Sequence, residues 1–203
     1  TGNLGRGEPA VTLTIPTSRL RTGENDLYIT SAQGPGRLYY VINHQVYRPQ
    51  EAIEAAGDVD VARSYLDPET KDPLETVTPG QLVRVDVTVT MPKDGAYILV
   101  EDHLPGGLEA LNERLNTSSH VASVPEPVYH WRSYGYNHKE VWENRVVFFI
   151  TELPQGAHTY TYYARATHAG DFVALPAEVS AMYDRSIWGR SASRAFRVVE
   201  REE

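Results

Sequence analysis

Residues 81–91 alternate between apolar and polar side chains over the length of a full β-strand, and this pattern constrains the fold more than any other. The apolar positions are Val83, Val85, Val87, Val89 and Met91. Successive side chains of a strand point to opposite faces, so these residues share one face and the polar residues share the other. The sequence therefore predicts a sheet with one buried side and one side in water.

A turn signal follows this strand directly. Pro92-Lys93-Asp94-Gly95 precedes a second apolar run, Ala96-Tyr97-Ile98-Leu99-Val100. Pro, Asp and Gly are favoured in tight turns because of their backbone preferences and local hydrogen bonding. The two runs are therefore predicted to pair as an antiparallel hairpin.

Other strand-like runs are separated by Gly, Pro, Asn or Asp. They cover residues 10–15, 26–30, 37–47, 59–65, 145–150, 158–167 and 194–200. In the run 158–167, the inward face is predicted to carry Tyr160, Tyr162, Ala164 and Ala166. Many short strands at this spacing are typical of a two-layer β-sandwich.

Two short stretches show helical spacing of apolar residues instead. Residues 107–115 place Leu108, Leu111 and Leu115 on one helical face, and residues 177–183 do the same for Val179, Met182 and Tyr183. Pro176 lies where the first turn of a helix tolerates proline. The expected fold is all-β, an antiparallel, immunoglobulin-like sandwich of two sheets, with one or two short helices.

A polar, alanine-rich stretch at residues 48–57 interrupts the succession of strand-like runs. We expect a boundary there, with residues 1–50 forming a few strands of a second β module and residues 51–203 forming the main sandwich. A few strands without a covering layer do not make a stable unit. The first segment is therefore predicted to dock on the larger part or to complete a module that lies partly elsewhere.

Composition excludes several classes of partner. The formal net charge is −8, whereas nucleic acids and anionic membranes are bound through clustered Lys and Arg. No window approaches the roughly 20 apolar residues that a bilayer span needs, so no direct membrane insertion is predicted. The chain starts without Met or a signal peptide, which favours a mature or excised piece of a longer protein.

No cofactor or metal site is predicted. The chain has 7 His and no Cys, and His103, His120, His130 and His138 lack the close pairing typical of zinc ligands. Asp58, Asp60 and Asp67 are oxygen ligands of the kind calcium prefers, but no third carboxylate lies close to the first two. Solvated loop and turn residues are the favoured interpretation of both groups.

No catalytic motif is present, so an enzyme is not expected. Gly189-Arg190-Ser191-Ala192-Ser193 lacks the closing glycine of a nucleophile elbow and precedes a strand. Gly34-Pro35-Gly36 has the glycines of a phosphate loop, but Pro35 removes a donor and no helix follows. This second motif is predicted to be a turn between two strands.

An aromatic cluster offers the best candidate for a partner surface. Its members are Tyr129, Trp131, Tyr134, Tyr136 and Trp142. Exposed rings can stack on a sugar or anchor a partner protein. The competing and favoured interpretation is that these rings cover one end of the sandwich. A glycosylation sequon at Asn116-Thr117-Ser118 lies just before the cluster.

Several segments in order resemble the C-terminal macroglobulin domain of bacterial alpha-2-macroglobulins. These are residues 77–85, 159–172 and 175–183, together with Asp102-His103-Leu104-Pro105-Gly106-Gly107-Leu108-Glu109-Ala110-Leu111-Asn112. Residues 20–27 and 34–40 are similar to strands that follow the thioester domain in that family and close its CUB-like module.

The resemblance implies a role without catalysis. Members of this family are large secreted or periplasmic protease inhibitors, which are cleaved in a bait segment and then cage or covalently hold the attacking protease. The implied partners are other domains of the same parent chain and, through the parent, target proteases. The implied location is the periplasm or the cell surface and extracellular space. The covalent step needs a thioester cysteine, which this chain does not contain, and no receptor-binding residue of the animal relatives is carried over.

A different class of function stays open on sequence grounds. A sandwich of this build could be an extracellular adhesion or surface-layer module that binds a glycan or protein through the aromatic cluster, since sandwiches host many functions. A long parent chain with a bait segment favours the inhibitor, and a short chain with anchoring signals favours the adhesin.

Overall fold

The computed structural model describes residues 10–30, 37, 39–44, 47, 49–112 and 135–200. The chain divides into two units, Thr1–Gln45 and Val46–Glu203. Helix is limited, within the described ranges, to two single 3-10 turns, η1 (Thr17–Arg19) and η2 (Gln50–Ala52). No helix in those ranges is long and apolar enough to cross a bilayer.

The first unit differs from its predicted strands. The described residues within 10–15, 26–30 and 37–47 form no strand, and all of them are exposed. Val11, Leu13 and Ile15, for example, keep 50%, 62% and 50% of their surface accessible. An extended run becomes a stable strand only when neighbouring strands satisfy its backbone and a second layer covers its apolar face. The prediction of strands here was wrong for the described residues.

The second unit is a β-sandwich. Its described strands are β1 (Ala56–Gly57), β2 (Asp60–Leu66), β3 (Thr76–Val77), β4 (Leu82–Met91), β5 (Gly95–His103), β6 (Leu108–Ala110), β7 (His138–Val141), β8 (Arg145–Leu153), β9 (Gly156–Ala166), β10 (Gly170–Ala174), β11 (Ala177–Ala181), β12 (Trp188–Arg190) and β13 (Arg194–Val198). Among the described residues they form a six-stranded sheet of order β1-β12-β11-β5-β8-β7, a four-stranded sheet of order β2-β4-β9-β6 and a three-stranded sheet of order β10-β13-β3. Pairing is antiparallel except between β13 and β3. The predicted all-β, antiparallel sandwich is confirmed.

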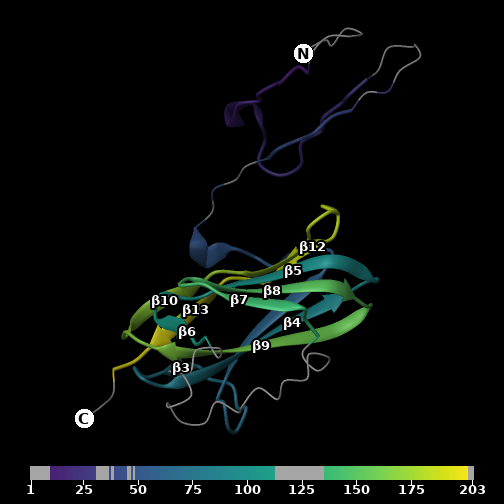
Figure 1. The fold of residues 1–203 in the computed structure, drawn as a ribbon. Helices are drawn as coiled ribbons and strands as arrows, with labels where there is room; N and C mark the ends of the chain where they lie inside the picture. Colours follow the sequence, from purple (N-terminus) through teal and green to yellow (C-terminus); the bar gives the residue numbers. More distant parts are fainter. Residues whose placement is uncertain are drawn as a thin grey trace. The chain divides into compact units, whose positions relative to one another are not determined.

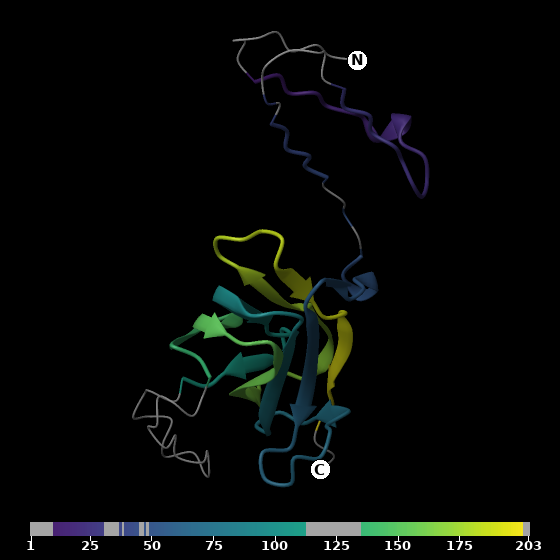
Figure 2. The ribbon, with the colours of Figure 1, turned by 90° about the vertical axis from the view of Figure 1, so that its right-hand side faces the viewer.

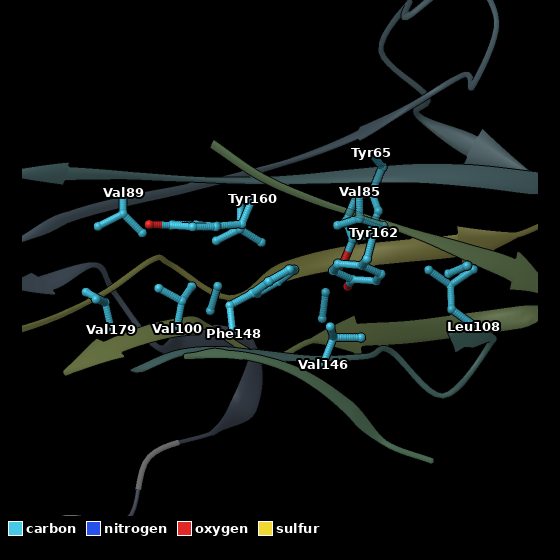
Figure 3. Packing of buried hydrophobic residues seen from close by; sticks show 14 of the residues in the cluster. Tyr65, Val85, Val89, Val100, Leu108, Val146, Phe148, Tyr160, Tyr162 and Val179 are labelled. Atoms are coloured by element: carbon cyan, nitrogen blue, oxygen red, sulfur yellow. The ribbon is translucent and has the colours of Figure 1, made fainter. Parts of the chain in front are cut away.

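The core lies between the six-stranded and four-stranded sheets, which Figure 1 shows as two layers. The predicted inward faces are correct. Val83, Val85, Val87 and Val89 are fully buried on β4, and Tyr160 and Tyr162 are buried on β9. Figure 3 shows Val85, Val89, Tyr160 and Tyr162 facing Val100, Val146, Phe148 and Val179 of the other layer. Phe148 and Tyr160 meet across the core with ring centroids 5.3 Å apart.

The predicted hairpin between residues 81–91 and 96–100 was wrong. Both segments are strands, but β4 pairs with β2 and β9, whereas β5 pairs with β8 and β11. The Pro92–Asp94 turn therefore carries the chain from one sheet to the other. Each strand has one apolar face, and the two faces meet across the core rather than side by side in one sheet.

Both predicted helices were also wrong for the residues described. Within 107–115, residues 108–110 form β6, and within 177–183, residues 177–181 form β11. In β11 the side chains of Ala177, Val179 and Ala181 are buried and Glu178 is exposed. Burial thus alternates along β11 with a period of two residues. Pairing with β5 on one side and β12 on the other imposes this alternation and overrides the weak helical spacing of the apolar residues.

We expect Leu108→Ala to lower the free energy of unfolding by about 2–5 kcal/mol, because a nearly fully buried leucine leaves a cavity when truncated. Leu108 keeps only 5% of its surface accessible, whereas Leu111 is half-buried. Leu111→Ala should therefore cost clearly less. Urea denaturation of both variants measures the difference, and equal midpoints for Leu108→Ala and the parent would contradict the placement of Leu108 in the core.

Candidate functional site

The described members of the predicted aromatic cluster lie in different surroundings. Tyr136 is partly buried and packs edge-on against Phe148, with ring centroids 5.2 Å apart. Trp142 is 51% exposed, and the guanidinium of Arg145 lies 5.4 Å from its ring centroid. Tyr129, Trp131 and Tyr134 lie outside the described residues. Binding of a partner through this cluster therefore stays a prediction.

The histidine and aspartate candidates take part in ordinary surface contacts. His138 Nε2 lies 3.4 Å from Glu140, and His103 Nε2 lies 3.9 Å from Glu101. No group of three or more His, Asp or Glu in the described ranges is arranged to hold a metal ion. His120, His130 and Asn116 lie outside those ranges.

Asp67 orders a turn. Its carboxylate accepts hydrogen bonds from the backbone N–H groups of Glu69 and Thr70 at 2.9 Å and 3.0 Å. These bonds to the charged form lower the pKa of Asp67. Ser191 has a comparable structural role, because its hydroxyl accepts the Ala177 N–H at 3.0 Å and donates to the Ala192 carbonyl at 3.2 Å.

An exposed apolar patch lies at one end of the six-stranded sheet, and the sequence did not identify it. We call it the β5–β12 patch, and it consists of Tyr97, Met182 and Tyr183, which are 50%, 52% and 79% exposed, together with Trp188, which is 42% exposed and lies opposite Ser180 on the neighbouring strand. The rings of Tyr97 and Tyr183 meet edge to face at 5.2 Å, and the Met182 N–H donates to the Tyr97 carbonyl at 2.9 Å. Figure 2 shows the yellow-green loop between β11 and β12 projecting from the strands.

The backbone beneath this patch is strained. Tyr97 has φ +54°, a left-handed conformation that bulky residues rarely adopt. Strain of this kind persists where the surroundings impose it, and it is concentrated at functional sites. Exposed apolar patches of contiguous large side chains mark interaction surfaces on soluble proteins. The patch is therefore a candidate interface in the part of the chain that the structure describes.

A charged group bridges the two main sheets inside the core. Arg63 of β2 donates from Nη1 to Asp102 Oδ1 of β5 at 2.5 Å, and the Tyr162 hydroxyl of β9 donates to Asp102 Oδ2 at 2.8 Å. The side chains of Arg63 and Asp102 are 3% and 0% exposed. We call this group the Arg63–Asp102–Tyr162 bridge. It ties one strand of the six-stranded sheet to two strands of the four-stranded sheet.

Burial dominates the electrostatics of the bridge. Burial raises the pKa of Asp102, while the Arg63 guanidinium and the Tyr162 hydroxyl act in the opposite direction. Burial, together with the charge of Asp102, raises the pKa of the Tyr162 phenol well above its usual value. Removing any one partner would leave polar groups unpaired in the core, and such groups are costly.

The sequence carries a signal for the bridge in the alternation of its strands. Asp102 continues the inward series Ile98 and Val100 on β5, and Arg63 lies between the inward positions Val61 and Tyr65 on β2. A charged residue at an inward position of an alternating strand implies a buried partner. The partner itself could not be identified from one sequence, because the pairing depends on how the sheets are stacked.

We expect alkaline unfolding to be coupled to the buried tyrosines. Burial raises the pKa of Tyr160 to about 12, and burial raises the pKa of Tyr65 still further. Because these folded-state values exceed the unfolded value of about 10, their contribution to stability is complete below about pH 10 and is lost as the pH rises toward them. Phenolate absorbance should show the buried tyrosines titrating only together with loss of the β circular-dichroism signal. Smooth titration of all tyrosines in a folded chain would contradict this.

The chain is similar to alpha-2-macroglobulins of bacteria by sequence. Residues 59–185 match the family model described as the bacterial alpha-2-macroglobulin MG10 domain. An alpha-2-macroglobulin homolog of Yersinia pestis is 26% identical over 202 aligned residues, which cover 88% of this chain and 10% of that protein. The chain thus spans about a tenth of the length of this relative.

Solved structures show the same fold. The crystal structure of native Escherichia coli alpha-2-macroglobulin from domain MG7 to the C-terminus aligns with a TM-score of 0.61 and 24% identity, covering 76% of this chain and 25% of that chain. Salmonella alpha-2-macroglobulin reacted with methylamine gives a TM-score of 0.61 and 24% identity, with coverage of 74% and 10%. Because the family match covers more than half of the chain and coincides with most of the sandwich, the chain belongs to the bacterial alpha-2-macroglobulin family and contains its MG10 domain.

Proposed function

We propose that this chain is a structural domain, without catalytic activity, of a bacterial alpha-2-macroglobulin that traps proteases. The observation that carries the proposal is the match of residues 59–185 to the MG10 domain. In support, E. coli alpha-2-macroglobulin, whose structures resemble this chain, has been solved in forms activated by trypsin and by porcine elastase. The proposed location of the parent protein is the periplasm or the cell surface.

The proposed mechanism is mechanical. The described residues of the sandwich form one continuous core, and the Arg63–Asp102–Tyr162 bridge links its two main sheets by charged hydrogen bonds. A core packed in this way resists internal deformation. The domain would hold neighbouring modules and shift as one body when a protease cleaves the parent chain.

The β5–β12 patch is the proposed contact with another module of the same parent chain. Its side chains are large, apolar and exposed, and the aligned relative is about ten times longer than the segment that matches. An intramolecular partner would bury this surface in the parent protein. Residues 1–50 are proposed to belong to a CUB-like module, whose remaining strands would cover the exposed apolar side chains of residues 10–30 and 39–44.

The passive role can be tested on the 203-residue chain itself. We expect the chain to leave the activity of trypsin and elastase unchanged at any ratio, because a framework domain without the rest of the trap cannot enclose a protease. Residual protease activity on a protein substrate provides the measurement. Inhibition that rises with the dose of the chain would overturn the proposal.

Hydroxyl-radical footprinting tests the docking surface. Met182 and Tyr183 should be oxidised readily in the 203-residue chain and protected in the full-length parent protein. Trp142, which is 51% exposed on the predicted aromatic cluster, serves as the comparison. Protection of Trp142 with continued oxidation of Met182 and Tyr183 would place the contact at the aromatic cluster and exclude the β5–β12 patch.

A further inference from the structure

The position of β2 along β4 is not determined by β4 itself. Arg63 lies opposite Val87, and Tyr65 lies opposite Val85. The inward face of β4 continues with the same residue type at Val83 and Val89, and all of these valines are fully buried. A shift of β2 by two residues preserves the alternation of inward and outward side chains. In one direction the shift again places Val61, Arg63 and Tyr65 opposite valines, and in the other direction only Val61 changes its type of neighbour, to Met91.

Outward side chains fix the pairing of β4 with β9 but not with β2. On the β9 side, the Thr161 hydroxyl donates to Asp86 at 2.8 Å, and the hydroxyls of Thr88 and Thr159 lie 2.9 Å apart. In the part of the chain that the structure describes, no side-chain hydrogen bond joins β2 to β4. The position of β2 must therefore be selected by contacts with elements other than β4. Just before β2, the N–H groups of Asp58 and Val59 donate to the Trp188 carbonyl of β12 at 3.0 Å and 3.2 Å, and within β2 the selecting contacts cross the core.

Within β2, the polar contacts across the core are those of Arg63, which takes part in the Arg63–Asp102–Tyr162 bridge and also donates to the His103 carbonyl at 3.4 Å. Asp102 belongs to the opposite sheet and holds Arg63 at 2.5 Å and the Tyr162 hydroxyl at 2.8 Å. A shift of two residues moves β2 by about 6.6 Å along its axis, since a strand rises about 3.3 Å per residue. The guanidinium would then leave the carboxylate, and two buried charges would lose their partners.

The apolar contacts of β2 discriminate less sharply between the native pairing and a shifted one. The Tyr65 ring packs on Phe196 of β13 with centroids 4.7 Å apart. Apolar side chains can repack after a shift with modest loss, because their attraction does not depend on direction. Buried charges cannot repack in this way, since each needs a specific partner at hydrogen-bonding distance.

We infer that the Arg63–Asp102–Tyr162 bridge is a register lock, which selects the pairing of β2 with β4 and adds little to the stability of the fold. The cost of removing both charges from water offsets much of their attraction, so a well-packed apolar replacement keeps the fold stable. An apolar replacement no longer penalises pairings in which β2 is shifted along β4, because no buried charge would lose its partner. This property concerns the specificity of the fold and is independent of the proposed function.

Disulfide trapping can test the lock, because the chain contains no cysteine of its own. Ala62 lies opposite Thr88 in the native pairing, on the outward face. Cysteines at 62 and 88 therefore report the native register. Cysteines at Asp60 and Thr88, or at Ser64 and Thr88, report shifts of two residues in either direction, and they keep the same strand geometry.

The decisive variant is Arg63→Met with Asp102→Leu and Tyr162→Phe in the 203-residue chain. We expect it to fold with a thermal midpoint no more than about 4 °C below that of the parent, a shift that reflects little change in stability for a chain of this size. We also expect a shifted cysteine pair to crosslink to a similar extent as the native pair, whereas the parent background crosslinks through the native pair alone.

The matched control removes the outward ion pair of β4. Arg84 Nε lies 2.9 Å from Asp86, and their side chains are 21% and 16% exposed. Arg84→Gln with Asp86→Asn should leave the crosslinking of β2 native. The inference is overturned if the apolar triple variant crosslinks only through the native pair. Failure of the triple variant to fold also overturns it, since the bridge would then be needed for stability.

Discussion

Replacing Asp102 alone by leucine is expected to lower the free energy of unfolding by about 3–5 kcal/mol, because one half of a buried ion pair is left without its partner. The Arg63 side chain is only 3% exposed, so bulk solvent has little access to replace the carboxylate. The Tyr162 hydroxyl, which is also buried, loses its acceptor. Urea denaturation of Asp102→Leu against the parent chain measures the loss.

Asp171 provides the matched control for this variant. It forms an ion pair with Arg197 at the same 2.5 Å distance, but the two side chains are 75% and 63% exposed. Exposed pairs contribute little because water and salt screen them. Asp171→Leu should therefore change the stability only slightly. Equal losses for the Asp102 and Asp171 variants would show that burial does not determine the strength of these pairs.

Replacing Gly189 by alanine is expected to destabilise the chain by about 3 kcal/mol or more, at or beyond the upper end of the usual cost of overpacking. A Cβ at this position would lie 1.9 Å from the Val59 carbonyl oxygen. That atom belongs to the backbone, so it cannot rotate away as the end of a side chain can. β12 would have to separate from the segment that leads into β2.

Gly80→Ala separates this crowding from the general cost of losing a glycine. Gly80 has φ +87°, but nothing lies within 4 Å of a Cβ placed there. Its replacement should cost only the strain of an alanine in a left-handed conformation, about 1–2 kcal/mol. Thermal unfolding of both variants gives the comparison, and a larger loss at Gly80 than at Gly189 would contradict the close approach of β12 to Val59.

The strands and their inward faces could be predicted from the sequence, because they depend on local alternation. The valines of β4 and the tyrosines of β9 are buried as expected. The partner of each strand could not be predicted in the same way. The turn at Pro92–Asp94 fits a hairpin, but a turn of this composition also serves when the chain crosses between sheets, and only the stacking of the layers decides between them.

The candidate site was less accessible to sequence reasoning than the fold. Tyr97 and Tyr183 are far apart in the chain, and their contact depends on the pairing of β5 with β11. Asp102 stood within the segment that indicated the family, but its role depends on Arg63 of another sheet. Both features arise from long-range pairing, which a single sequence without related sequences does not reveal.

The crossing of the chain between sheets after β4 has a consequence for how the protein is made. During synthesis, β4 emerges long before β9, since the bonded residues Asp86 and Thr161 are 75 positions apart. β5 is likewise synthesised before β8 and β11, the two strands with which it pairs. Folds dominated by such distant contacts form slowly, and their unpaired strands are prone to aggregate in the meantime. The valine-rich face of β4 therefore stays uncovered in the nascent chain until the opposite layer has been made, and aggregation competes with folding during that interval.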